Sequence, residues 1–323
     1  MLIWIIDEEW SDYDLEHEIL EKELPGVEIR HSTYDYEADL KAFGYQADGI
    51  LAQVYADIPR ETIEQLEQCK GIAVYGGGFD RIDIDACKDK GIKVTNIQDY
   101  CSEDLADYVI AAIYHGNKHV TDYAESCLDN VKAGKWGALA GAYQTHRIEN
   151  QKILLVGFGG IGRVVAKRLL PLGIEIMAYD EYTDSASIKA AGVRPVSWEE
   201  GFKEADYVSI HLRGVDSNAD KIGANEFKLM KNSAYLINTA RGKIVKEQDL
   251  IDAVTQKDIA GAILDVIKNE PPAENDPILS TDGILVTPHV SYMSYESMRA
   301  LKEYALGNLL AMLSNKEPRN PVC

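Results

Sequence analysis

Residues 152–163 read Lys-Ile-Leu-Leu-Val-Gly-Phe-Gly-Gly-Ile-Gly-Arg, an apolar run that ends in a GxGxxG pattern. The pattern glycines Gly157, Gly159 and Gly162 have separate physical tasks at a dinucleotide site. They permit a tight turn from strand to helix, close approach of backbone N–H groups to a pyrophosphate, and close packing of the helix on the strand. Gly160 and Ile161 complete the turn and start the helix. The stretch therefore predicts a nucleotide-binding turn with these five residues as contacts.

The neighbouring residues supply the rest of a strand–turn–helix–strand unit. Ile153–Val156 is typical of a buried strand, and apolar residues recur at helical spacing through 161–169. A proline and a glycine end this helix, and 173–179 returns as a second strand. Asp180 follows, 23 positions after Gly157, where a carboxylate can accept a hydrogen bond from a ribose hydroxyl.

The acid after this second strand bears on the choice of cofactor. Glu181 adds a second negative charge beside Asp180, and no local arginine offsets it. Because a 2′-phosphate would be repelled there, the sequence favours NAD over NADP. The alternative for the two residues is a pair of solvated turn acids.

Length and composition limit the class of protein. The chain has 323 residues, which favours two domains, and 53 acidic against 33 basic side chains give a formal net charge of −20. This charge argues against nucleic acid or an anionic membrane as a partner. No apolar run approaches the ~20 residues that span a bilayer and no signal-peptide pattern is present, so a cytoplasmic protein is expected. The five cysteines are scattered without a CxxC pair, which predicts reduced thiols and no metal site.

Two series of strand-like runs alternate with helical patterns. The first series contains 2–6, 27–31, 49–54, 71–75 and 92–96. The second contains 153–156, 175–179, 207–211, 234–238, 261–265 and 284–287. Such alternation predicts parallel sheets. We therefore expect an α/β fold of two Rossmann-like or flavodoxin-like parallel-sheet domains with an interdomain cleft.

Two helical patterns predict how the domains are connected. Ser102 is expected to cap a helix with two acids in its first turn, which bridges the domains. The final helical pattern, 295–313, should pack back on the first domain. Residues 1–100 with 290–323 are thus predicted to form the substrate (catalytic) domain, and 101–289 the NAD-binding Rossmann domain.

Three charged residues follow strand-like runs after the nucleotide pattern. Arg241 lies in NTARG, Glu270 in LDVIKNEP and His289 in TPH. Since the carboxyl ends of strands in open α/β sheets face the ligand crevice, a cation, a carboxylate and an imidazole there suit a substrate clamp and a proton donor held by an acid. The structural alternatives are helix-terminal ion pairs for Arg241 and Glu270 and a satisfied core histidine for His289.

The order GxGxxG, NTARG, LDV…EP and TPH resembles the D-isomer-specific 2-hydroxyacid dehydrogenases (D-lactate dehydrogenase-like), over nearly the whole chain. The segments VYGGGFDRID, from residue 74, and GIKVTN, from residue 91, are also similar to that family. The resemblance implies an NAD-dependent oxidoreductase that interconverts a small 2-oxo acid and its D-2-hydroxy acid by hydride transfer. It also implies a homodimer, for which we expect an interface within residues 102–143.

The resemblance implies roles for the three charged residues. Arg241 would bind the substrate carboxylate and 2-oxo oxygen with its planar guanidinium. His289 would donate the proton in reduction and remove it in oxidation. Glu270 would favour the charged imidazole and so sustain reduction to higher pH.

The resemblance also implies binding residues. The expected contacts are the backbone amides of Gly76, Gly77 and Gly78 for the substrate carboxylate, Tyr100 and Tyr292 for the substrate pocket, and Asp265, Thr239 and Ala240 for the nicotinamide. Glycines suit the first of these tasks because a ligand can approach their backbone closely. An ordinary turn is the alternative for the glycines, and aromatic packing is the alternative for Tyr292.

Two positions depart from the family pattern. The segment SIHLRGVD, from residue 209, lacks the proline that many members have after the histidine. Asp107-Tyr108 stands where an acid–histidine pair is common. These departures concern the geometry of the cofactor loops and remove no proposed catalytic group.

A second hypothesis is an NAD(H)-sensing binding protein that resembles dehydrogenase-like corepressors. The three charged residues do not separate it from an enzyme, since fold and cofactor site do not determine function. NADH binding without turnover of any 2-oxo acid would favour this alternative.

Overall fold

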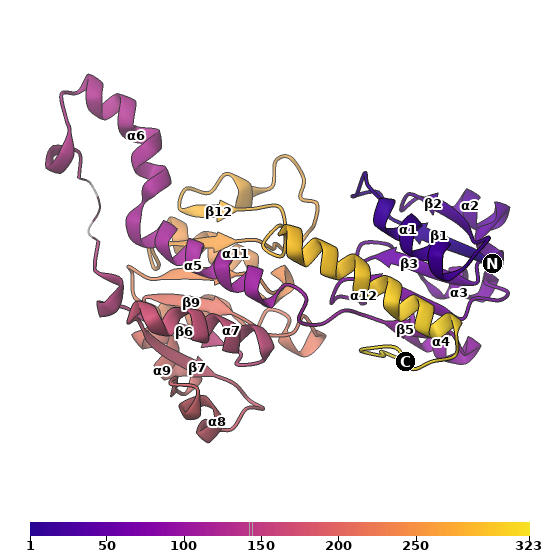
Figure 1. Ribbon diagram of the computed structural model, residues 1–323. Coiled ribbons are helices and arrows are strands. Elements are labelled where there is room, and N and C mark those ends of the chain that lie inside the picture. Colours follow the sequence, from indigo (N-terminus) through magenta and orange to yellow (C-terminus); the bar gives the residue numbers. More distant parts are fainter. Residues whose placement is uncertain (142, 144) are drawn as a thin grey trace. The chain divides into compact units, whose positions relative to one another are not determined.

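The computed structural model describes residues 1–141, 143 and 145–323, which form two compact units (Figure 1). Met1–Tyr100 and Ser294–Cys323 make up the first unit, and Cys101–Met293 makes up the second. Within the described ranges, no helix combines the length and apolar character needed to cross a membrane.

The first unit is built on a parallel five-stranded sheet with the order β2-β1-β3-β4-β5. Its strands are β1 (Leu2–Ile6), β2 (Glu28–Ser32), β3 (Gly49–Gln53), β4 (Gly71–Tyr75) and β5 (Lys93–Thr95). Alternate side chains enter two cores on opposite faces of the sheet. One core is covered by α2 (Glu37–Ala42), α3 (Arg60–Gln65) and α4 (Ile84–Lys90), and the other by α1 (Asp14–Glu23) and α12 (Tyr295–Leu313).

The last helix packs on the first unit's sheet, as the sequence predicted. Two strands of that sheet begin with glycine where the helix crosses them. A Cβ on Gly49 would lie 2.7 Å from Leu309 Cδ1, and one on Gly71 would lie 2.6 Å from Met312 Sδ. The missing side chains therefore let α12 approach the sheet directly.

The second unit is built on a parallel seven-stranded sheet with the order β12-β11-β10-β9-β6-β7-β8. Its strands are β6 (Lys152–Val156), β7 (Glu175–Tyr179), β8 (Arg194–Pro195), β9 (Tyr207–Ile210), β10 (Tyr235–Asn238), β11 (Gly261–Leu264) and β12 (Ile284–Val286). Helices α5 (Ser102–Lys118), α7 (Gly160–Leu169) and α8 (Ser185–Ala190) cover one face. The other is covered by α9 (Trp198–Glu204), α10 (Ala224–Leu229) and α11 (Glu247–Thr255). The predicted fold class of two parallel α/β sheets is confirmed, and only the two-residue strand β8 lacked a recognisable pattern.

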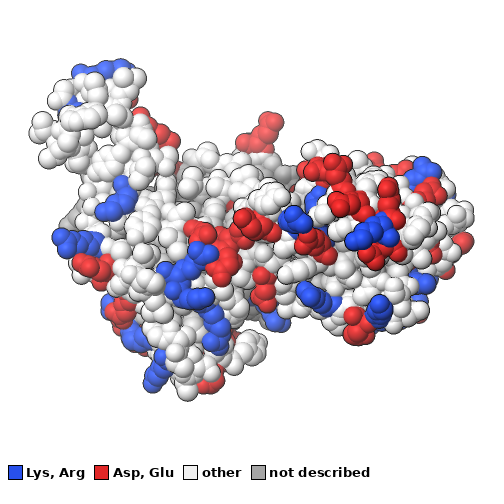
Figure 2. Space-filling view, viewed as in Figure 1, with Lys and Arg blue, Asp and Glu red and all other residues white. Residues whose placement is uncertain are grey.

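Helix α5 corrects one prediction about helix capping. The N-cap is Cys101 rather than Ser102, and no side chain caps this end. Ser102 is the first helical residue and is buried, so it stands one position too late to be the N-cap. The helix is instead fixed by Arg168 of α7, which lies 2.6 Å from Glu103 and 2.7 Å from Asp107. Figure 2 shows basic and acidic side chains interspersed in this way over the second unit.

Candidate active site

The GxGxxG turn joins β6 to α7, and each pattern glycine meets a different constraint. Gly157 has φ +103°, and a Cβ there would lie 2.6 Å from the carbonyl oxygen of His211. A Cβ on Gly162 would lie 2.6 Å from the Gly157 carbonyl oxygen, so the helix packs directly on the turn. Gly159 differs, because no described heavy atom lies within 4 Å of its Cβ position. Its backbone is open to a ligand at the N-terminus of α7.

Asp180 follows β7 and its carboxylate faces the same turn. Oδ2 accepts a hydrogen bond from the Phe158 N–H at 2.6 Å, and Oδ1 accepts from the N–H groups of Tyr182 and Thr183 at 2.8 and 2.7 Å. Burial raises the pKa of Asp180, but these backbone hydrogen bonds outweigh it and leave the pKa below its ordinary value. An ionised acceptor thus stands beside the open glycine turn, and together they fit a dinucleotide and its ribose.

Glu181 is not the unopposed charge that the sequence suggested. Lys221 Nζ lies 2.7 Å from Glu181 Oε1, and the Tyr179 hydroxyl donates to the same oxygen at 3.1 Å. The hydrogen bond from Lys221 keeps the pKa of Glu181 below its ordinary value. This expectation was wrong because the opposing cation comes from 40 positions further along the chain. Asp180 is therefore the carboxylate that can repel a 2′-phosphate.

His211 follows β9 and lies against the glycine turn. Its Nε2 is 3.0 Å from Ser209 Oγ. Burial lowers the pKa of His211 to about 4. The imidazole is therefore neutral at physiological pH, which makes it part of the turn's support and not a proton donor at pH 7.

The stability of the protein without cofactor should depend on His211 between pH 6.5 and pH 4. The unfolded chain binds a proton near pH 6.5 and the folded chain does not, so the free energy of unfolding falls as the pH drops. From pH 7 to pH 5 this loss should be about 1–2 kcal/mol, since one pKa unit corresponds to ~1.4 kcal/mol. Urea unfolding of the parent and of His211→Gln should show their stability difference shrinking by that amount at pH 5. A difference that does not change with pH would contradict the assignment.

The three predicted catalytic residues lie beyond the carboxyl ends of three neighbouring strands. Arg241 follows β10, Glu270 follows β11 and His289 follows β12. These strands are adjacent in the sheet and pair in parallel. The fold therefore brings the three loops to one edge of the second unit's sheet, as expected for a ligand site.

His289 and Glu270 form a direct pair. His289 Nδ1 lies 2.8 Å from Glu270 Oε2, and Glu270 Oε1 accepts from the Ile267 N–H at 2.9 Å. His289 has φ +53°, which few non-glycine residues adopt, and its N–H donates to the carbonyls of Asp265 and Thr287, both at 2.9 Å. The carboxylate thus holds the imidazole of His289 through Nδ1.

Arg241 is held by the loop that closes β10. The side-chain amide of Asn238 donates to the Arg241 carbonyl and accepts from the Ala240 N–H, each at 3.0 Å. Arg241 Nη1 donates to the Ala240 carbonyl at 2.7 Å. A guanidinium carries five N–H donors in a planar arrangement that suits a carboxylate.

Two glycines determine where this loop lies. A Cβ on Gly214 would lie 2.4 Å from Arg241 Cγ, so the arginine stem packs on bare backbone. A Cβ on Gly242 would lie 1.9 Å from the Ile267 carbonyl, which joins the arginine loop to the loop that holds Glu270. The backbone segments that carry Arg241 and Glu270 are therefore in direct contact.

Asp265 is buried and anchors the segment that carries His289. Oδ1 accepts from the Thr287 hydroxyl at 2.6 Å and from the Val290 N–H at 2.9 Å, and Oδ2 accepts from the Ser291 N–H at 2.8 Å. A carboxylate has about four acceptor positions. Among the described residues, one position on Oδ2 is left for a carboxamide, so a nicotinamide fits here.

The remaining predicted residues of the second unit lie near this edge. Tyr292 places its ring 6.2 Å from the His289 ring at 86°. Thr239 is buried directly after β10, and Ala240 follows it with the amide and carbonyl already engaged as described above.

The predicted substrate residues of the first unit lie after β4 and β5. Gly76 has φ +142° and its N–H donates to the Val74 carbonyl at 3.0 Å, so Gly77 and Gly78 are the better candidates for binding an anion. The Asn96 side-chain amide donates to the Gly77 carbonyl at 2.8 Å and shapes the loop. Tyr100 packs, half-buried, against the core of this unit.

Several residues that hold the site were not predicted. They are Asn96, Thr287 and Asn238, whose polar groups position the loops described above, and Gly214 and Gly242, which allow close packing. Asn238 is visible in the sequence as a polar residue at the end of an apolar strand. The contacts of Gly214 and Thr287 leave no local pattern.

Comparison with known proteins supports this two-sheet architecture. Residues 112–291 match the family described as "D-isomer specific 2-hydroxyacid dehydrogenase, NAD binding domain". A glycerate dehydrogenase of Methylorubrum extorquens is 31% identical over 81% of this chain and 81% of the relative. A glyoxylate reductase of Thermococcus litoralis is 30% identical over 86% of this chain and 84% of the relative. The structure of D-lactate dehydrogenase from Aquifex aeolicus, complexed with NAD and lactic acid, has a TM-score of 0.82 and 25% identity, covering 98% of this chain and 96% of that one.

The chain therefore belongs to the D-isomer-specific 2-hydroxyacid dehydrogenases, which are NAD-dependent oxidoreductases. The resemblance stated from the sequence motifs is confirmed. NAD is confirmed as the cofactor, in agreement with the fit of the glycine turn and Asp180.

Gly159→Ala should weaken NADH binding at least about tenfold without reducing the stability of the cofactor-free protein. The new methyl group meets no protein atom, but it occupies space that a pyrophosphate needs beside the helix N-terminus. Fluorescence titration with NADH and thermal unfolding would measure the two effects. Gly307→Ala on α12 is the matched control, since its Cβ also meets nothing within 4 Å and it should leave the NADH Kd unchanged. Equal Kd values for both variants would contradict the assignment.

Proposed function

We propose that this protein reduces small 2-oxo acids of two or three carbons to the corresponding 2-hydroxy acids with NADH, and that a chiral product has the D configuration. The observation that carries the proposal is the 2.8 Å pair of His289 Nδ1 and Glu270 Oε2 at the carboxyl edge of the sheet. A carboxylate that is itself oriented by a backbone N–H fixes the imidazole for proton transfer.

The acid–base work falls to His289. When bound, NADH supplies the hydride. In reduction the imidazolium gives its Nε2 proton to the carbonyl oxygen of the substrate, and in oxidation the neutral ring removes the hydroxyl proton there. Glu270 stabilises the charged ring and holds its orientation through Nδ1.

Substrate binding falls to groups with positive charge or free N–H donors. The guanidinium of Arg241 binds the carboxylate and polarises the 2-oxo oxygen, so that the carbonyl accepts electrons more readily. In the first unit, we assign the amides of Gly77 and Gly78 as N–H donors for a carboxylate, with Tyr100 as a substrate-binding residue of the same unit. In the second unit, Tyr292 is the aromatic residue beside His289. Asp265 accepts a hydrogen bond from the nicotinamide carboxamide, and Thr239 and Ala240 contact the nicotinamide through their backbone.

The names of the relatives support a small substrate. They are a glycerate dehydrogenase, glyoxylate reductases and a hydroxypyruvate reductase. The test is oxidation of NADH, with NADPH in parallel, across glyoxylate, hydroxypyruvate, pyruvate, 2-oxoisocaproate and phenylpyruvate. We expect the highest kcat/KM with the first three and with NADH, because Asp180 repels a 2′-phosphate. Bound NADH without turnover of any oxo acid would instead support the sensing hypothesis.

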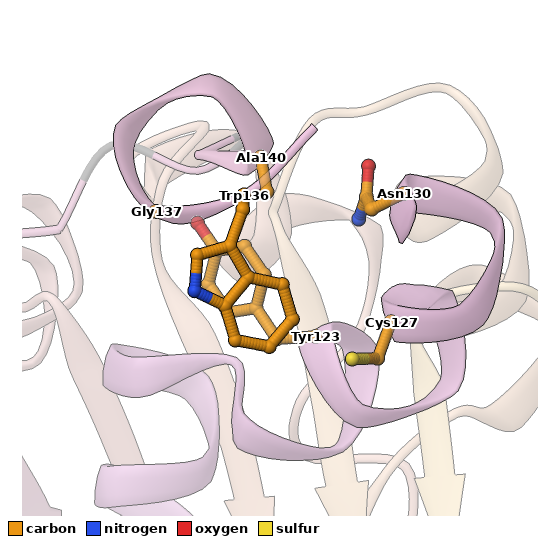
Figure 3. Close-up of a pocket in the computed structure, with 6 residues that line it drawn as sticks. All are labelled: Tyr123, Cys127, Asn130, Trp136, Gly137 and Ala140. Atoms are coloured by element: carbon orange, nitrogen blue, oxygen red, sulfur yellow. The ribbon is translucent and has the colours of Figure 1, made fainter. Parts of the chain in front are cut away.

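We also propose a homodimer that forms through α6 (Val120–Lys132) and the residues after it. No residue of α6 is buried, and the helix extends away from the sheet of its own unit (Figure 1). The exposed apolar side chains here include Val120, Leu128, Val131, Trp136 and Leu139. Figure 3 shows Trp136 beside Tyr123 at a pocket between α6 and the following turn. Such a patch favours a protein partner. The expected interface range also includes residue 142, which lies outside the described residues.

The mass in solution tests the dimer. Light scattering should give a mass of about twice 35.9 kDa for the parent protein. A Leu128→Glu, Trp136→Glu double variant should have the mass of one chain, about 35.9 kDa. Tyr182→Glu is the control, because Tyr182 is 95% exposed outside this surface and should leave the mass unchanged. A parent that is monomeric at micromolar concentration would overturn this proposal.

A further inference from the structure

Tyr108 reaches the edge of the sheet that carries His289 from a helix distant in the sequence. The residue lies on α5, whose buried residues Ala106, Val109 and Ile113 fix the helix on the second unit's sheet. Its half-buried side chain ends with Oη 2.5 Å from Thr287 Oγ1, although the two residues are 179 positions apart. Thr287 in turn lies 2.6 Å from Asp265 Oδ1. The three side chains form one continuous chain of hydrogen bonds.

The direction of these hydrogen bonds follows from the donor inventory. An ionised carboxylate can only accept, so the single hydroxyl proton of Thr287 points to Asp265. Thr287 Oγ1 must then accept from Tyr108, which makes the phenol the donor at the start of the chain. Burial raises the pKa of Tyr108, in keeping with a hydroxyl that retains its proton.

This series of hydrogen bonds ends at the Asp265 carboxylate, which fixes the backbone around His289. Asp265 accepts from the N–H groups of Val290 and Ser291, and its own carbonyl accepts from the His289 N–H. His289 sits at φ +53°, a conformation that persists only when its surroundings impose it. A carboxylate that can rotate would loosen both anchoring N–H contacts at once.

We propose that Tyr108 is a positioning residue for His289: through Thr287 it fixes the Asp265 carboxylate, and that carboxylate fixes the segment that presents the imidazole. The inference rests on the proposed function of His289 in proton transfer. The family pattern commonly has histidine at this position. Positioning of Asp265 by a phenol is therefore a property of this particular protein.

Removal of the single hydroxyl tests the proposal. Tyr108→Phe should lower kcat about 5–30-fold, the loss expected when a buried hydrogen-bond network loses one member. The NADH Kd should change less than threefold. In the cofactor-free protein, hydrogen exchange of a peptide that spans residues 287–293 should become faster, which reports on the segment without any turnover.

A matched control separates positioning from general stability. Tyr207→Phe removes another largely buried hydroxyl of the same unit, which donates to Gln151 at 3.2 Å. It should lower the melting temperature by about as much as Tyr108→Phe but leave kcat and the exchange of 287–293 unchanged. Tyr108→His, which restores a donor, should recover part of kcat.

A double-mutant cycle tests the path through Thr287. Thr287→Val removes both hydrogen bonds of the hydroxyl, so adding Tyr108→Phe to it should cost less than twofold further in kcat. If the fold-losses in kcat of the two single variants multiply in the double variant, the proposal is overturned. It is also overturned if Tyr108→Phe keeps the parental kcat and the parental hydrogen exchange of residues 287–293. If the parent itself turns over no 2-oxo acid, the proposed function fails, while the exchange result still decides whether Tyr108 holds the segment.

Discussion

Replacing His289 by glutamine is expected to lower kcat for 2-oxo acid reduction by about 10²–10⁴-fold, the usual contribution of a general acid. Glutamine keeps polar volume beside Glu270 but cannot donate and take up a proton in turn, as an imidazole can. The segment is held mainly through the backbone of residues 289–291, so the variant should fold. Steady-state kinetics at saturating NADH would measure the loss.

NADH binding separates this loss from damage to the cofactor site. The variant should bind NADH within about twofold of the parent, because the glycine turn and Asp180 are on other loops. His17→Gln, at an exposed histidine of the first unit, is the control and should keep parental kcat. A His289→Gln enzyme that also retains near-parental kcat would remove His289 from the mechanism.

The second large effect is expected at Arg241. Arg241→Lys keeps the charge but replaces a planar fork by a point charge, so it cannot make two parallel hydrogen bonds to a carboxylate. One charge-assisted hydrogen bond contributes about 1.5–3 kcal/mol, so kcat/KM for the oxo acid should fall about 10–150-fold. Arg241→Gln also lacks the positive charge, so its kcat/KM for the oxo acid should be lower still.

The control for this prediction lies in the same unit. Arg213→Lys changes an exposed arginine shortly after β9 and should leave kcat/KM unchanged. If Arg241→Lys also retains parental kcat/KM, the guanidinium does not bind the substrate, and the clamp must be sought among other cations at this edge.

Most of the fold was predictable because buried parallel strands leave continuous apolar runs. The runs at 2–6, 71–75 and 175–179 match β1, β4 and β7 at both ends, and 295–313 matches α12. The errors concern ends and caps. The Ser102 cap was wrong because a serine before a helical pattern can equally be its first buried residue.

The chemistry of the site was predictable only as far as motifs reach. NTARG, LDV…EP and TPH supplied the residues after β10, β11 and β12, and sheet topology brought them together. Side-chain pairs between distant segments left no signal. The Glu181–Lys221 pair spans 40 positions and the Tyr108–Thr287 contact spans 179, and neither residue pair has a recurring spacing. Such contacts depend on how loops and helices pack, which a local pattern does not encode.

The most direct test of the central claim is the identity and handedness of the product. Pyruvate and NADH would be incubated with the purified protein, and the lactate formed would be resolved by chiral chromatography against NADH consumed. The account predicts D-lactate alone, in equal amount to the NADH oxidised. L-lactate, a racemate, or NADH oxidation without lactate would contradict it.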